Sequence, residues 1–289
     1  MTATAAARRH PLVSFFALTY GLSWGAALIV LGASHFNLVE LSPVDTGFIF
    51  VSMLLGPSVS GLMLTALLEG RLGLRRLGAS LLKWRVGTRW YALALLVMPL
   101  LLFATLWLLS VFVDAAFVPR FQWPLFAIGA VAGTFEEIGW TGFATQRLLA
   151  RHRPFIAGLL LGLAWALWHA LVDFRQNFHV MGITWLLEFA IFYVATLTAY
   201  RLLMTRVYAN TQSLLLAVLM HASYTGWLFA LYPGTSFQQG LIWQTVLAIG
   251  LWLAVAVGFR KPMPPRSTAT AGRTVNLSDN AAGPRGDKH

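Results

Sequence analysis

The chain of 289 residues contains no cysteine, which excludes a disulfide framework, a thiolate metal site and a cysteine nucleophile. Charged residues are also scarce at 11%, whereas hydrophobic residues make up 58%. Soluble domains carry about 25% charged residues, so this composition excludes an ordinary soluble protein. The sequence also lacks a Gly-rich phosphate loop, an H-E-x-x-H zinc motif and an internal repeat.

Acidic residues are few, and the formal net charge is +11. In a soluble protein this excess would suggest nucleic acid as a partner. Here the Lys and Arg residues lie in short loops between apolar runs, where they set the orientation of membrane spans. We therefore expect no nucleic-acid partner and an integral protein of the lipid bilayer.

Hydropathy predicts an all-α polytopic membrane protein with a bundle of about eight transmembrane helices. A span needs about 20 apolar residues. The first run follows two arginines and is longer than a signal-peptide core, so we expect it to be retained. The eight runs are Leu12 to Leu31, Gly47 to Leu68, Trp90 to Val113, Trp123 to Thr145, Pro154 to Val172, Val180 to Tyr200, Thr211 to Leu231 and Gly240 to Gly258.

The basic residues predict the topology through the positive-inside rule. Only Arg120 and Arg175 fall on the opposite side, so 19 of the 21 Lys and Arg residues (21 minus 2) agree. We therefore predict a cytoplasmic (inner) membrane protein with both termini in the cytoplasm. The agreeing residues are Arg8, Arg9, Arg71, Arg75, Arg76, Lys83, Arg85, Arg89, Arg147, Arg151, Arg153, Arg201, Arg206 and those from Arg260 onward.

The chain divides into four parts. Residues 1–122 hold the first three spans and an amphipathic segment at 71–87, whose leucines and cations alternate at helical spacing and predict a helix in the membrane interface. Residues 123–231 form the core, and residues 232–259 form the last span. The tail, residues 260–289, is rich in Pro, Ser, Thr, Gly and Ala without apolar periodicity, so we predict a disordered cytoplasmic tail.

Three acidic residues, Glu136, Glu137 and Glu188, remain inside predicted spans, and two histidines, His169 and His221, join them. A charge at the bilayer centre costs at least about 2.5 kcal/mol, so such residues mark functional sites. Glu188 fits no motif, and an interhelical hydrogen bond is as good an interpretation as a direct role.

Helical rise places three of these groups in one layer. At about 1.5 Å per residue, Glu136 lies about 16 Å above Arg147, with His169 about 24 Å and His221 about 22 Å above the basic markers of their own spans. A carboxylate can take a proton from water, and imidazoles can position that water and polarise a carbonyl. The three residues therefore predict a hydrolytic site that water reaches through a cavity.

Local spacing refines this site. His169 lies four residues after Trp165, and Thr225 lies four residues after His221, so each pair shares one helix face. Glu136 and Glu137 point about 100° apart on a helix. We therefore expect the two carboxylates to do different jobs.

Three segments carry a resemblance to a known family. Glu136-Glu137-Ile-Gly-Trp-Thr-Gly-Phe, Trp165-Ala-Leu-Trp-His169 and His221-Ala-Ser-Tyr-Thr225 resemble the three motifs of the CPBP family of intramembrane glutamic endopeptidases, also described as CAAX prenyl protease 2 or Abi proteins. The similarity covers about residues 123 to 227, and order, spacing and placement in successive spans agree.

This resemblance implies a membrane-embedded hydrolase that cleaves a peptide bond in prenylated or other membrane-associated peptides or membrane proteins. It implies that Glu136 activates water and that His169 helps to hold it. His221 and Thr225 would stabilise the oxyanion, with Glu137 as the second motif carboxylate. No cofactor and no metal are expected, and the oligomeric state is left open.

Two positions depart from the family pattern. The first motif is usually Glu-Glu-x-x-x-Arg, and Thr141 stands at the Arg position, so Glu137 is expected to lack its cation. The third motif commonly ends in Asn, where Thr225 offers one hydroxyl. Losing an oxyanion donor can cost about 10²-fold in rate.

Two alternatives stay open. Glu136, His169 and His221 form a donor set that could bind a catalytic zinc ion. A non-catalytic protein of the same fold is the other alternative, either an immunity protein or scaffold or a proton-coupled transporter, because intramembrane carboxylates also serve as proton relays.

Overall fold

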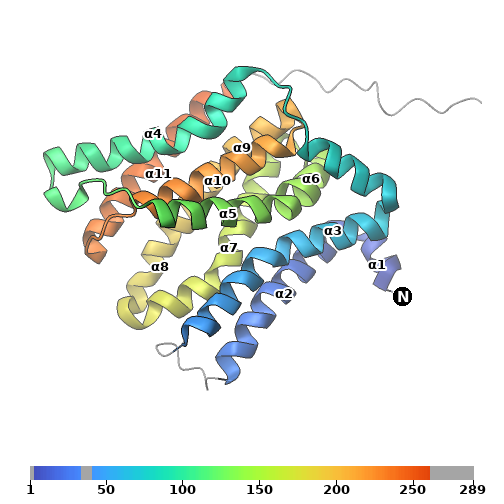
Figure 1. Cartoon of the computed structure of the whole chain (residues 1–289), viewed down its shortest axis with the longest axis horizontal. Helices are drawn as coiled ribbons and strands as arrows, with labels where there is room; N and C mark the ends of the chain where they lie inside the picture. The colour runs from blue at the N-terminus through green and yellow to red at the C-terminus, as the bar shows by residue number, and fades with distance from the viewer. Residues whose placement is uncertain (1–2, 34–40, 261–289) are drawn as a thin grey trace, which may run out of the picture.

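The computed structural model describes residues 3–33 and 41–260, which form helices and no strand (Figure 1). Seven helices in this part of the chain are long and apolar enough to cross a membrane, which confirms an all-α polytopic membrane protein. The main helices are α1 Ala3–Arg9, α2 Pro11–Ala33, α3 Pro43–Leu81, α4 Thr88–Phe112, α5 Trp123–Gly139, α6 Gln146–Arg151, α7 Pro154–Met181, α8 Trp185–Glu188, α9 Thr198–Thr211, α10 Leu214–Leu231 and α11 Phe237–Phe259. The predicted tail lies, from residue 261 onward, outside the described residues.

The remaining predicted span, Trp123 to Thr145, is helical throughout but is not one α-helix. After α5 the backbone widens into a π-helical segment, η2, at Trp140–Thr145, and then continues as α6. The Thr145 hydroxyl donates to the Trp140 carbonyl, five residues earlier, at 2.9 Å. A second π-helical segment, η4 at Phe189–Leu197, separates α8 from α9. Such widened turns occur often at functional sites, and η2 follows the two motif glutamates directly.

Helix α3 contains the predicted amphipathic segment as its final part. The helix has 39 residues and changes direction at Gly70, where φ is 60° and ψ is −152° (Figure 1). Only glycine adopts this backbone conformation without strain. The segment predicted at 71–87 is therefore helical to Leu81 and joined directly to the preceding span, and its position in the membrane interface stays a prediction.

Two pairs of glycines bring the site-bearing helices together. On α5, Gly129 and Gly133 pack against the α10 backbone, and a Cβ on Gly133 would lie 2.7 Å from backbone atoms of His221. On α7, Gly158 and Gly162 pack against α9, and a Cβ on Gly162 would lie 2.7 Å from the Thr198 Cα. Spacing small residues four apart lets membrane helices approach closely. The pairs α5 with α10 and α7 with α9 are visible in Figure 1.

Several basic segments meet at one end of the bundle. The Ser80 hydroxyl donates to the Gln212 carbonyl at 3.0 Å, and the Ser213 hydroxyl donates to the Lys83 carbonyl at 2.6 Å. The Arg147 guanidinium contacts Glu69 at 2.5 Å. The end of α3, α6 and the α9–α10 turn therefore share one end, as the charge pattern predicts. The assignment of this end to the cytoplasm stays a prediction.

Candidate active site

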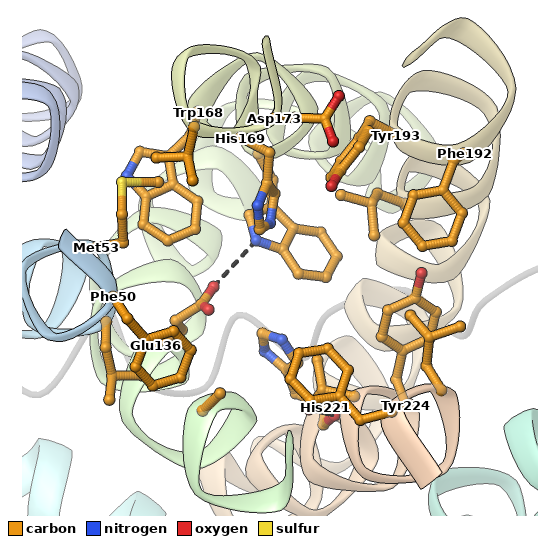
Figure 2. Close-up of a pocket in the computed structure, with 18 of the residues that line it drawn as sticks. Phe50, Met53, Glu136, Trp168, His169, Asp173, Phe192, Tyr193, His221 and Tyr224 are labelled. Carbon is orange, nitrogen blue, oxygen red and sulfur yellow. Dashed lines mark hydrogen bonds between the residues drawn. The ribbon is translucent and has the colours of Figure 1, made fainter. Parts of the chain in front are cut away.

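Glu136 on α5, His169 on α7 and His221 on α10 line one cavity of about 250 Å³ (Figure 2). This arrangement confirms that the three residues come together from three separate spans. Their side chains point toward the same space in Figure 2. Asp173 also lines this cavity, which therefore brings together two carboxylates and two imidazoles, the kinds of polar group that hydrolysis requires.

Two tryptophans hold the Glu136 carboxyl group. The Trp140 and Trp165 indole N–H groups both donate to Oε2, at 3.2 and 3.1 Å, and the second bond is drawn in Figure 2. Glu136 is only 6% exposed. The indoles therefore satisfy one carboxyl oxygen and fix the orientation of the group at the cavity wall.

Glu137 points away from the cavity into a fully buried polar cluster. The Arg201 guanidinium on α9 forms two hydrogen bonds with it, at 2.9 and 3.0 Å. The His221 Nδ1 lies 2.7 Å from Oε1, and the Thr141 hydroxyl donates to Oε2. Glu136 and Glu137 thus occupy different environments, as their angular separation on the helix predicts.

The expectation that Glu137 lacks a cation is therefore wrong. Arg201 supplies it from a helix that is distant in sequence, and Thr141 adds a hydroxyl to the same carboxylate. The charge pattern of the sequence predicts that Arg201 lies at the cytoplasmic surface. In the structure its side chain is instead fully buried, with 0% exposed. The apolar sequence that continues beyond it, Leu202-Leu203-Met204, is the one signal of its burial in the sequence.

The hydrogen bond to Glu137 defines the orientation of the His221 ring. A carboxylate only accepts hydrogen bonds, so Nδ1 carries the hydrogen in this contact. The other ring nitrogen, Nε2, is buried and has no protein partner in the described part of the chain. Because His221 lines the cavity, Nε2 is the ring atom available to a water molecule or a substrate.

His169 sits among aromatic rings. Its imidazole lies 4.8 Å from the Trp168 ring and 5.1 Å from the Tyr193 ring, centroid to centroid. Helix α7 is tied to α2 by two hydrogen bonds, from the Tyr20 hydroxyl to the Ala164 carbonyl at 2.5 Å and from the Trp24 indole to the Trp168 carbonyl at 2.8 Å. Both acceptors precede His169, so α2 fixes the turn of α7 that leads into this residue.

Thr225 lines the cavity, but its hydroxyl lies 2.5 Å from the Gly129 carbonyl and 3.1 Å from the His221 carbonyl. A hydroxyl has one hydrogen to donate, and here it serves backbone oxygens. The role of Thr225 as an oxyanion donor stays a prediction.

Glu188 is not among the residues that line this cavity. It accepts a hydrogen bond of 3.4 Å from Gln244 on α11, which is the interhelical alternative.

The rest of the wall is mostly apolar, and sequence reasoning missed several of its members. Two of its polar groups were not anticipated. The Tyr224 hydroxyl and the Trp168 indole N–H are buried without a protein partner among the described residues, and both residues line the cavity. Apolar residues complete the wall, from α3 (Ile49, Phe50, Met53) and from α10 (Leu228, Phe229).

The candidate zinc ligands Glu136, His169 and His221 share this cavity. Within residues 3–33 and 41–260, no group of three or more His, Asp or Glu side chains is arranged to hold a metal ion. His221 directs Nδ1 to Glu137, and two indoles donate to Glu136 Oε2. In this arrangement His221 Nδ1 and Glu136 Oε2 already have protein partners, and the zinc alternative stays a hypothesis.

Comparison with known proteins agrees with the three motifs. Residues 118–227 match the family model described as type II CAAX prenyl endopeptidase Rce1-like. The chain is also similar to CAAX prenyl protease 2 of Methanococcus maripaludis, with 41% identity over 54 residues. That match covers 19% of this chain and 20% of the length of the relative. These comparisons support the family that the three motifs predict, the CPBP family of CAAX prenyl endopeptidases, and the family match lies within residues 118–227 of this chain.

Proposed function

We propose that this protein is an intramembrane endopeptidase that hydrolyses a peptide bond with water activated by Glu136. The observation that carries the proposal is the single cavity lined by Glu136, His169 and His221 inside the helix bundle. The family match of residues 118–227 supports the same class of reaction.

In the proposed reaction, the Glu136 carboxylate takes a proton from a water molecule that His169 helps to position. The water oxygen attacks the carbonyl carbon of the substrate, and the C=O electron pair moves onto the oxygen. His221 Nε2, which has no protein partner among the described residues, is the ring atom that would contact the reacting groups. When the tetrahedral intermediate collapses, the C–N bond breaks, and the proton taken from water passes to the leaving nitrogen.

We propose membrane-associated peptides, including prenylated ones, as substrates. The mostly apolar wall formed by α3 and α10 matches an apolar side chain or lipid chain better than a polar peptide. The similar protein of Methanococcus maripaludis carries the name CAAX prenyl protease 2. A peptide with a farnesylated cysteine and its unmodified counterpart separate these substrate classes.

The test is peptide cleavage by the purified full-length protein in proteoliposomes. Glu136→Gln removes the base while keeping the size of the side chain, and we expect cleavage to fall at least about 10²-fold, the lower range for general base catalysis. Glu188→Gln is the matched control, because Glu188 is another carboxylate inside the bundle but outside the cavity lining.

The result that contradicts the proposal is equal cleavage by Glu136→Gln and wild type. His169→Ala is expected to lose activity as well. Metal analysis with chelator treatment tests the zinc alternative, since a stoichiometric metal and chelator-sensitive cleavage would replace the glutamate mechanism. Proton-coupled flux without any cleavage would instead support the transporter alternative.

A further inference from the structure

Arg201 is a cation buried at the centre of the bundle, and it does not line the cavity. Its side chain is 0% exposed, and its NH1 and NH2 atoms contact the two different oxygens of Glu137. Such a two-pronged contact fixes the plane of the carboxylate as well as its charge. Arg201 is therefore close to the proposed site without access to a substrate.

One arm of contacts leads from Arg201 to His221. Glu137 Oε1 lies 2.9 Å from Arg201 NH2 and 2.7 Å from His221 Nδ1. Because Arg201 holds this oxygen, it also holds the acceptor that orients the imidazole. The free nitrogen of the ring, Nε2, is thereby directed away from Glu137.

A second arm leads from Arg201 to Glu136. The guanidinium carbon lies 4.3 Å from the centre of the Trp165 ring, within the range of a cation–π interaction. The same indole donates its N–H to Glu136 Oε2 at 3.1 Å and lies edge-on to His221, with 4.9 Å between ring centres. Arg201 thus contacts Glu137, which orients His221, and Trp165, one of the two indoles that hold Glu136.

The energetics of burial favour a role beyond stability. Taking two charges out of water is costly, and well-packed apolar replacements of a buried pair are often neutral or stabilising. Removing only one partner is strongly destabilising, because an unpaired charge remains. A buried ion pair such as Arg201 and Glu137 is therefore a poor way to stabilise the fold compared with apolar packing at the same place.

We propose that Arg201 is a positioning residue that orients His221 through Glu137 and Glu136 through Trp165. This inference rests on the proposed function of the cavity. It assigns Arg201 on α9 to the proposed reaction, although the three family motifs do not include it. It also explains how Glu137 is held although Thr141 occupies the position of the expected cation.

The kinetic test compares Arg201→Met with Arg206→Met in the full-length protein. Arg206 lies on the same helix, and its guanidinium carbon is 5.1 Å from the centre of the Phe259 ring. It therefore serves as a matched control. We expect Arg201→Met to lower kcat about 100-fold, the loss typical of a misplacement of about 1 Å, with KM unchanged because Arg201 does not touch the cavity. We expect Arg206→Met to retain the wild-type kcat.

A double variant separates positioning from folding. Glu137→Leu combined with Arg201→Met removes both charges together and leaves no unpaired ion. We expect this protein to unfold at a temperature near that of wild type and still to have a low kcat, because His221 Nδ1 has lost its acceptor. A folded and fully active double variant would overturn the proposal.

Histidine 15N NMR provides a readout that does not depend on cleavage. His221 is assigned by comparison with His221→Asn, and we expect its Nδ1–H form in wild type and a changed nitrogen spectrum in Arg201→Met. An unchanged spectrum together with an unchanged kcat would overturn the role of Arg201 while leaving the peptidase intact. An inactive wild-type protein whose His221 signal depends on Arg201 would instead refute the proposed function alone.

Discussion

Replacing Gly133 with alanine tests how tightly the packing of α5 on α10 controls the site. The added Cβ would lie 2.7 Å from the Ala222 nitrogen and from the His221 carbonyl group. Ordinary contacts begin at 3.4 Å, so the backbones must separate by about 0.7 Å (3.4 minus 2.7). These neighbours are backbone atoms and cannot rotate away. Overpacking of this kind costs about 1–3 kcal/mol of stability.

The same displacement acts on the proposed chemistry. Gly133 lies one turn before Glu136, and its contact on α10 is His221 itself. A misplacement of about 1 Å can cost 10²-fold in rate, so we expect kcat to fall about 10- to 100-fold. The measurement is peptide cleavage in proteoliposomes, with thermal unfolding of the same samples.

Gly25→Ala in α2 is the matched control, because a Cβ at Gly25 meets no atom within 4 Å. It makes the same chemical change inside a membrane helix, and we expect it to keep wild-type activity and stability. Wild-type kcat and wild-type unfolding temperature in Gly133→Ala would refute the idea that the α5–α10 contact sets the geometry of the cavity.

Two further substitutions test individual hydrogen bonds. Trp165→Phe removes the indole N–H that donates to Glu136 Oε2. Because hydrogen bonds to charged groups contribute about 1.5–3 kcal/mol, we expect kcat to fall about 10- to 100-fold in single-turnover cleavage. An unchanged kcat would show that this hydrogen bond does not contribute to the reaction. Thr225→Val removes the hydroxyl bound to the Gly129 carbonyl, so we expect a loss of about 1 kcal/mol in stability and little change in kcat. A loss of about 10²-fold in kcat would instead support Thr225 as the oxyanion donor.

The span pattern and the principal cavity residues could be predicted from the sequence. Apolar runs of sufficient length have few structural alternatives in a bilayer, and buried carboxylates are costly enough to stand out. Glu136, His169 and His221 stood out because each is polar within an apolar run, and they do line one cavity.

Features that depend on which helices are neighbours could not be predicted. Arg201 lies next to Leu202 near the end of an apolar run, where its charge looks like that of a loop residue. Only the ion pair that it forms with Glu137 in the folded bundle shows its partner. The hydroxyl direction of Thr225 depends on the approach of Gly129. The sequence likewise shows that α3 contains an amphipathic part, but the change of direction at Gly70 depends on the non-helical backbone conformation of that residue.

The ion pair between Glu137 and Arg201 has a consequence for the biogenesis of the protein. The two charges lie on α5 and α9, so the carboxylate is synthesised 64 residues before its cation. Until α9 enters the membrane, α5 carries an acidic group whose insertion costs about 2.5–3.5 kcal/mol on translocon scales. Stable insertion of the helix that carries Glu136 therefore depends on a later helix, and a nascent chain that ends before α9 would hold α5 less firmly in the bilayer.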